Sequence, residues 1–261
     1  MARKVEPLEP LGSGSDFSSF LQHLGIPTLD LGFGGEDGGG EYHSIYDSFD
    51  DYRRFKDPTF EYGVALSKTA GHAILRMADA DLLPFDFRNL DTTISKYVTE
   101  LTELTDKMRD NTAMENQLIK ANDFTLATDP TKHEKGPEAK AEVPKLDFSL
   151  LKTALDSLKK CAGRLATTWA TASQTNAGHD KLNQLLFHAE QQLLSDGLPR
   201  RPWYRHTIYA PGFYTGYGVK TLPGIREAIE QRNWAEAQEQ IAVVAQHITN
   251  LAGYLNGVSS N

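Results

Sequence analysis

The chain has 261 residues, of which 39% are hydrophobic and 24% are charged, proportions that are ordinary for a globular protein with a sizeable core. Its formal net charge of -8 argues against nucleic acid and anionic membranes as partners, because both need clustered Lys and Arg. It contains neither the roughly 18 consecutive apolar residues of a membrane span nor the apolar stretch of a signal peptide, so we expect a soluble polypeptide. The single cysteine, Cys161, excludes an internal disulfide and is expected to be a small apolar residue of a helix.

The segment before Pro84 is mixed in character and rich in glycine. Ser15 or Asp16 can cap a short helix, because such side chains accept hydrogen bonds from the first free N–H groups of a helix. The spacing places four apolar residues on one face of that helix: Phe17, Phe20, Leu21 and Leu24. Residues 26–31 alternate in polarity, which predicts a short strand, and Pro27 confines it to a sheet edge or a strand start.

A glycine-rich stretch at 32–41 is predicted to be a flexible loop. A long helix follows, for which Asp57 supplies the cap and Pro58 takes the first helical position, and it is predicted to run to about Ala80. We place a domain boundary at Pro84, because helical periodicity dominates the sequence beyond it.

Further helices are predicted near 88–112, 147–175 and 178–195, with a last pair beginning at Pro223 and Asn233. The first of them has apolar residues on one face: Leu90, Ile94, Tyr97, Leu101, Leu104 and Met108. Residues 129–144 are polar with several prolines and are expected to be a solvent-exposed insertion. Residues 197–224 are rich in aromatics, Pro and Gly and are predicted to form a long loop, a type of loop that is more often functional than idle.

Two interpretations are open for the segment from Gly12 to Asp16. Glycine lets the backbone approach a ligand closely, and the helix that follows offers free N–H donors at its start. Alternatively, the segment is only a turn followed by a helix cap. It is not the Gly-x-Ser-x-Gly elbow of serine hydrolases, because its Gly and Ser residues fall in the wrong order.

His43 is a candidate metal ligand, since a neutral imidazole is the commonest zinc ligand and this one follows a loop that holds Glu36, Asp37 and Glu41. However, no second histidine lies within metal-site spacing, and the chain has no His-Glu-x-x-His motif. The carboxylates also lack the spacing of a calcium-binding loop. From these residues alone, a solvated loop is the competing interpretation.

The aromatic loop contains Tyr204, His206, Tyr214 and Tyr217. Their ring and hydroxyl groups could line a pocket or could seal the loop against the helices. A Ser/His/Asp relay through His206 can be imagined, but many serines and aspartates would serve, so the pattern does not support that hypothesis.

Several segments, taken in chain order, resemble segments of glutamate carboxypeptidase II, whose family also contains the transferrin receptor. They are Leu11-Gly-Ser-Gly-Ser-Asp-Phe17, Tyr42-His-Ser-Ile-Tyr-Asp-Ser-Phe49, Phe55-Lys-Asp-Pro-Thr-Phe60 and Arg201-Pro-Trp-Tyr-Arg-His-Thr-Ile-Tyr-Ala-Pro211, followed by Leu222-Pro-Gly-Ile225. The resemblance implies an α-rich chain that is the last third or so of a longer protein. Residues 1–82 would be the C-terminal remnant of an α/β zinc-peptidase domain, and residues 83–261 a helical, bundle-like dimerisation domain.

The resemblance also implies roles for individual residues. His43 matches the last zinc ligand of a two-zinc site, and Tyr42 matches a tyrosine whose hydroxyl supports the tetrahedral intermediate. Tyr217 matches a tyrosine that helps to hold the terminal carboxylate of the substrate. The loop that flanks the scissile bond is matched by Ser13, Gly14 and Ser15, although the family enzyme has Asn where Ser15 stands.

Two departures from the family pattern bear on specificity. The glutamate-selective enzyme has a lysine directly before its last tyrosine, where this chain has Gly216, and its arginine patch falls at Asp30 and Gly32. Losing these cations removes the charge-assisted hydrogen bonds that favour acidic substrates. We therefore expect a parent enzyme that does not prefer glutamyl or aspartyl peptides.

The first functional hypothesis is therefore a fragment of a co-catalytic zinc exopeptidase of the carboxypeptidase type, with peptides as substrates. It would be inactive alone, because the other zinc ligands and the glutamate base would lie upstream of Met1. The alternative is a non-catalytic module for dimerisation, like the transferrin receptor, and retention of Tyr42 and His43 favours the peptidase. An unrelated helical scaffold is a third option, which the order of the motifs disfavours.

The expected partners are the upstream part of the peptidase domain and a second copy, bound through an apolar helix face. Without the upstream part, Phe17, Phe20 and Leu31 are expected to expose apolar surface. The resemblance is compatible with a membrane-anchored parent whose catalytic part is extracellular or lumenal.

Overall fold

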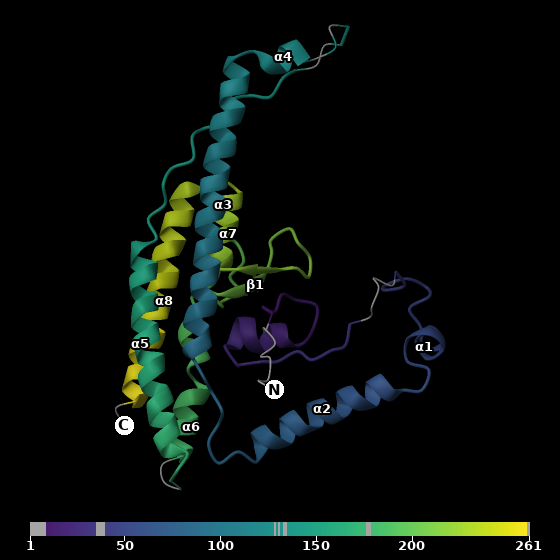
Figure 1. The fold of residues 1–261 in the computed structure, drawn as a ribbon, viewed down its shortest axis with the longest axis vertical. Helices are drawn as coiled ribbons and strands as arrows, with labels where there is room; N and C mark the ends of the chain where they lie inside the picture. Colours follow the sequence, from purple (N-terminus) through teal and green to yellow (C-terminus); the bar gives the residue numbers. More distant parts are fainter. Residues whose placement is uncertain are drawn as a thin grey trace, which may run out of the picture.

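The computed structural model describes residues 9–34, 40–127, 129, 131–132, 135–175 and 179–259. Its main body is a bundle in which α3 (Arg88–Lys120), α5 (Ser149–Ala172) and α8 (Trp234–Ser259) lie side by side (Figure 1). The most extensive packing joins α5 to α8, and α3 packs on α5. The predicted helical, bundle-like architecture is confirmed for this part of the chain.

The apolar face predicted for α3 forms part of the bundle core. Ile94, Tyr97 and Leu101 are buried, and the other three predicted residues pack against the core while remaining partly exposed. Cys161 is buried on α5 as an unpaired cysteine, as predicted. None of the helices in the described part of the chain has an apolar stretch long enough to cross a membrane.

Helix α3 continues to Lys120, beyond the predicted end near residue 112, and its far end projects past the bundle together with α4 (Asp123–Ala127) (Figure 1). The returning chain supports this projection, because Asn116 exchanges two hydrogen bonds with the backbone of Lys140, at 2.8 and 2.9 Å. The residues of the predicted insertion that the structure describes are mostly exposed and lack helix and strand, in agreement with the prediction.

The predicted helix over 178–195 is wrong in its second half. Helix α6 (His179–Phe187) ends early and is followed by a 3-10 turn, η3 (Glu190–Leu193). The chain then becomes extended because it pairs with 205–207: Ser195 N donates to Arg205 O at 2.8 Å, and Thr207 N donates to Leu193 O at 3.0 Å. Local periodicity continues through this stretch, but pairing with a distant segment overrides it.

The predicted loop over 197–224 contains a short antiparallel hairpin that the sequence analysis missed. Strand β1 (Tyr209–Pro211) pairs with β2 (Val219–Thr221), with Tyr209 opposite Thr221. Helix α7 (Pro223–Glu230) begins at its proline as predicted, since proline suits the first helical position. The residues between the strands form the hairpin loop, 212–218.

The N-terminal part departs from the predictions at two places. The short helix exists as η1 (Ser18–Leu24), but no side chain caps it, so the capping role proposed for Ser15 or Asp16 is wrong. The strand predicted at 26–31 is irregular chain, because the described residues offer it no sheet to join. Phe17 is buried, contrary to expectation, whereas Phe20 and Leu31 are exposed as expected.

Helix α2 (Glu61–Ala78) lies away from the bundle, after the short turns α1 (Phe49–Asp51) and η2 (Tyr52–Lys56) (Figure 1). It begins three residues later than predicted from Pro58, and Phe60 occupies the cap position. No residue of α2 is buried, although its sequence is largely apolar. This helix therefore has an apolar surface without a partner among the residues that the structure describes.

Candidate active site

Three segments that are far apart in the sequence meet at one place: residues 12–14, residues 42–43 and the hairpin loop 212–218. Ser13 N donates to Tyr217 O at 3.1 Å, and Ser13 Oγ donates to Gly216 O at 3.4 Å. These bonds span about two hundred positions of the sequence, a separation that no local pattern reveals. They attach the N-terminal glycine turn to the hairpin.

The glycines of this turn are required by close approach of the hairpin. A Cβ on Gly12 would lie 2.1 Å from Tyr217 O, and a Cβ on Gly14 would lie 3.0 Å from Cδ1 of the Tyr217 ring. Gly14 also has a φ of 102°, a conformation that L residues rarely adopt. The glycines of this segment therefore allow close approach of Tyr217 of the same chain, and approach to a ligand stays a prediction.

Tyr42 and His43 face the same region from a turn that follows the glycine-rich part of the sequence. Their rings stack with centroids 3.9 Å apart, and the His43 ring meets the Tyr217 ring edge-on at 6.4 Å. His43 has a φ of 60°, and its N–H donates to Asp47 Oδ2 at 3.3 Å. A left-handed conformation in a residue other than glycine is costly, and such strain clusters at functional sites.

The structure thus brings together the following predicted site residues: Ser13, Gly14, Tyr42, His43, Gly216 and Tyr217. Ser15, the remaining one, is exposed at the end of the turn, where its carbonyl accepts the Ser18 N–H at 3.2 Å. Tyr42, His43 and Tyr217 are also exposed to solvent. The cluster is an open surface made of aromatic rings, hydroxyl groups and one imidazole.

The described residues do not by themselves fit a zinc ion. Zinc takes three or four protein ligands, whereas no group of three His, Cys, Asp or Glu side chains in the described part of the chain could hold a metal. Glu41 is bound by Lys56, and this hydrogen bond lowers the pKa of the Glu41 carboxyl. Glu36 and Asp37 lie outside the described residues. His43 can therefore provide one ligand, and the rest of a site would have to come from elsewhere.

His206 is structural rather than catalytic. It is fully buried, its Nε2 lies 2.9 Å from Glu190 Oε1, and its Nδ1 accepts the N–H groups of Ile208 and Tyr209 at 3.2 Å each. An acceptor at Nδ1 with a carboxylate at Nε2 assigns the neutral ring with its proton on Nε2. These hydrogen-bond partners of the ring include no serine among the described residues, so a Ser/His/Asp relay gains no support here.

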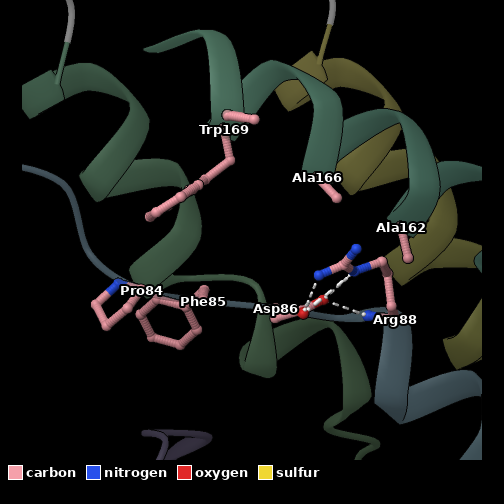
Figure 2. Close-up of a pocket in the computed structure, with 8 residues that line it drawn as sticks. Pro84, Phe85, Asp86, Arg88, Ala162, Ala166 and Trp169 are labelled. Atoms are coloured by element: carbon pink, nitrogen blue, oxygen red, sulfur yellow. Dashed lines mark hydrogen bonds and ion pairs between the residues drawn. The ribbon is translucent and has the colours of Figure 1, made fainter. Parts of the chain in front are cut away.

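A cavity of about 310 Å³ lies elsewhere, between α5 and the segment that leads into α3 (Figure 2). Its walls are largely apolar and include Phe85, Trp169 and the small residue Ala166. The basic group at its edge, Arg88, is bound by both carboxylate oxygens of Asp86 at 2.7–3.2 Å. This cavity therefore offers neither a free cation nor a nucleophile, and the aromatic cluster remains the better candidate site.

The sequence analysis missed the residues that support the cluster from behind. Gln22 is fully buried, and its Nε2 donates to Leu11 O at 3.1 Å and to Gly12 O. The backbone carbonyl of Gln22 accepts the N–H groups of Arg205 and His206 at 2.9 and 3.1 Å. A single Gln beside an apolar helix face gives no pattern that distinguishes it from a surface residue.

Comparison with known proteins places the chain among peptidase-like relatives. Residues 146–256 match the transferrin receptor-like dimerisation domain. A probable glutamate carboxypeptidase, LAMP1, of Arabidopsis thaliana is 31% identical over 254 residues, which cover 94% of this chain and 32% of the relative. A probable glutamate carboxypeptidase of Arthroderma benhamiae is 31% identical over 258 residues, covering 94% of this chain and 30% of the relative.

An aminopeptidase, NAALADL1, of Rattus norvegicus is 25% identical over 272 residues, which cover 98% of this chain and 32% of the relative. The chain therefore spans about a third of the length of the curated relatives that it matches. These relatives include both carboxypeptidases and an aminopeptidase, so their names agree on peptide hydrolysis and differ on the end of the peptide that is attacked.

Proposed function

We propose that the chain is the C-terminal part of a zinc exopeptidase of the glutamate carboxypeptidase-like family, because it matches the transferrin receptor-like dimerisation domain and is similar to two probable glutamate carboxypeptidases. The observation that supports the proposal most directly is the meeting of Tyr42 and His43 with the hairpin residue Tyr217. A module used only for dimerisation has no need of this arrangement, which includes a strained histidine. The non-catalytic alternative is therefore the weaker one.

In this proposal each part of the cluster has one task. His43 supplies one zinc ligand, and zinc, when bound, would polarise the peptide carbonyl. The Tyr42 hydroxyl donates a hydrogen bond to the oxygen that becomes negative during attack. The Tyr217 hydroxyl helps to bind the terminal carboxylate of the peptide, and the Ser13–Ser15 turn flanks the scissile bond beside Gly216.

The remaining zinc ligands and the general base belong, in this proposal, to an upstream part of the peptidase domain. The unpartnered apolar surface of the N-terminal part supports this division, because contiguous apolar patches usually mark an interface. Exposed apolar side chains are numerous there and include Ile45, Phe55, Ile74 and Leu75. The proposed boundary stays at 1–82 for the peptidase portion and 83–261 for the helical portion, and this chain by itself is proposed to be inactive.

We also propose that the helical portion forms a homodimer through an exposed face of the bundle, as the matched domain description suggests. Light scattering of the chain at micromolar concentration should give twice the 29.0 kDa of one chain. A monomeric mass would contradict this proposal without affecting the one on peptide hydrolysis.

The experiment that tests the peptidase proposal uses the chain joined to its upstream part. Tyr42→Phe and His43→Ala should each lower kcat/KM for a dipeptide, the first by about 100-fold or more, as removal of one donor to an oxyanion does. His43→Ala should also reduce zinc content, which is measured separately by metal analysis. Normal turnover and normal zinc content in both variants would contradict the assigned roles.

The same protein tests specificity. Peptides blocked at either terminus distinguish a carboxypeptidase, which we propose, from an aminopeptidase. A neutral dipeptide should be cleaved at least as well as an acidic one, because Gly216, Asp30 and Gly32 stand where the resemblance predicts cations. Nearby basic residues are also engaged, with Arg201 on Glu227 and Lys220 on Glu230. A large preference for the acidic peptide would overturn this specificity.

A further inference from the structure

A buried ion pair lies behind the hairpin loop and has no role in the function proposed above. Arg201 Nη2 donates to Glu227 Oε2 at 2.5 Å, and both side chains are almost completely shielded from solvent. Each partner also makes a second bond to the hairpin. Arg201 Nη1 donates to Pro211 O at 2.6 Å, and Glu227 Oε1 accepts the Phe213 N–H at 2.5 Å. The pair therefore binds the hairpin backbone on both sides of the point where β1 ends and the loop begins.

The loop 212–218, which starts at this point, is closed by its own hydrogen bonds. Gly212 N donates to Gly218 O at 2.9 Å, Gly218 N donates to Thr215 O at 3.0 Å, and Thr215 Oγ1 donates to Gly218 O at 2.8 Å. The closed loop presents Tyr217, whose carbonyl binds the glycine turn through Ser13 N. A continuous set of bonds thus leads from α7 to both substrate-facing segments.

Stability alone is a poor explanation of this pair. Taking two charges out of water costs several kcal/mol per ion in real proteins, which largely offsets their attraction, so such pairs add little net stability. The pair instead fixes the position of the hairpin, because the planar guanidinium holds its two donor groups in a fixed geometry. Arg201 also lies over the ring of Phe213 at 5.3 Å, which helps to fix the loop residue whose N–H Glu227 accepts.

We propose that Arg201 and Glu227 are positioning residues that hold the 212–218 loop, and through it Tyr217 and the glycine turn, in the geometry that binds the peptide substrate. The consequence for catalysis rests on the proposed function, whereas the consequence for loop geometry does not. Both residues act through the hairpin, by hydrogen bonds to its backbone and by the packing of Arg201 on the Phe213 ring.

The test on the chain itself is amide hydrogen exchange at Ser13, whose N–H binds Tyr217 O. In Glu227→Gln the amide oxygen can still accept the Phe213 N–H. Its NH₂ group faces the Arg201 donors, so the hydrogen bond between the two side chains is lost. Exchange at Ser13 and Gly212 should accelerate by about tenfold or more, the factor expected for losing a hydrogen bond to a charged group. The amides of α5 and α8 should keep their rates.

The matched control is Glu230→Gln, the same change on the same helix. Glu230 binds Lys220 at 2.7 Å in a more exposed pair, so its loss should leave exchange at Ser13 unchanged. Arg201→Lys is the second variant, because an ammonium group keeps the charge but cannot span both acceptors. If Glu227→Gln does not fold, Arg201→Lys decides by the same criterion.

In the complete enzyme, Arg201→Lys should lower kcat/KM by about 10- to 100-fold, as small misplacements of binding groups do. The rise in KM should be larger than the fall in kcat, since Tyr217 holds the peptide in the ground state as well as the transition state. Unchanged exchange at Ser13, equal acceleration in Glu230→Gln, or acceleration throughout the bundle would overturn the proposal. Absence of peptidase activity in the unmodified enzyme would instead overturn the proposed function, while the exchange result would still decide the role of the pair.

Discussion

At the scale of single residues, the glycines of the N-terminal turn show how little space separates this turn from the hairpin loop 212–218. Gly12 meets the Tyr217 carbonyl and the Val219 N–H, which are backbone groups that cannot move independently of the hairpin. Gly14 meets a ring instead, which can turn. A side chain is therefore harder to accommodate at Gly12 than at Gly14, although the φ of Gly12 is not in the left-handed region.

Gly12→Ala should consequently separate the turn from the hairpin. Inserting a methyl group into a filled space typically costs about 1–3 kcal/mol, and here the Ser13–Tyr217 hydrogen bond would be lost as well. The measurement is the melting temperature together with amide exchange at Ser13. Gly32→Ala is the control, because a Cβ at that position meets nothing within 4 Å. Equal behaviour of the two variants would show that the contact is not tight.

At the scale of elements, helix α2 depends on a carboxylate that lies outside it. Asp57 Oδ2 accepts the Gly63 N–H at 2.8 Å, Oδ1 accepts the Tyr62 N–H at 3.3 Å, and the Tyr52 hydroxyl donates to Oδ2 at 3.1 Å. The sequence analysis assigned Asp57 to the start of this helix, but as a cap directly before Pro58. The side chain does satisfy N–H groups of the first turn, from farther away.

The pKa of Asp57 gives this contact a pH dependence. Burial raises the pKa of the carboxyl, but the bonds from Gly63, Tyr62 and Tyr52 outweigh burial and bring the pKa below the ordinary 3.8. The unfolded segment therefore takes up a proton first as the pH falls. The contribution of Asp57 is present above pH 3.8 and is lost as the pH falls through the folded pKa.

Asp57→Asn should therefore lower the helical content at neutral pH. The further loss of helical content on acidification should be smaller in this variant than in the unmodified chain. Circular dichroism at 222 nm between neutral pH and about pH 2 measures both effects. Asp50→Asn is the control, since Asp50 is exposed and binds only nearby arginines at the surface in the described structure. An acid transition in Asp57→Asn identical to that of the unmodified chain would contradict the assignment.

At the scale of the whole molecule, the two parts of the chain differ in how they are buried. The bundle has a continuous core from Leu82 to Val258. The part before it is anchored around η1, where Leu21 within it and Phe17 directly before it are buried. The chain from 26 to 78 has only Asp57 buried among its described residues. This difference agrees with the proposed division near Pro84, with η1 as the contact between the parts.

Limited proteolysis should therefore cleave first between residues 40 and 80, while the bundle stays intact, because exposed chain with few buried contacts opens readily. Mass spectrometry of early fragments locates the cuts. Addition of the upstream part should protect α2, since the proposed interface covers it. Equal resistance on both sides of Pro84 in the isolated chain would count against the division.

The sequence by itself determined the helices whose period is strong, the start of α7 at Pro223 and the set of residues to inspect at the site. The helices and the start of α7 follow from side-chain spacing and from the backbone preference of Pro, which act over a few residues, whereas the set of site residues came from the resemblance to a known family. Only the tertiary structure decided that the helix predicted over 178–195 ends at Phe187 and that a hairpin interrupts the aromatic loop. It also decided that Glu227 binds this hairpin. The physical reason is the same in each case: the deciding hydrogen bonds, such as Ser195 with Arg205 and Phe213 with Glu227, join residues that lie outside the few positions over which local preference acts.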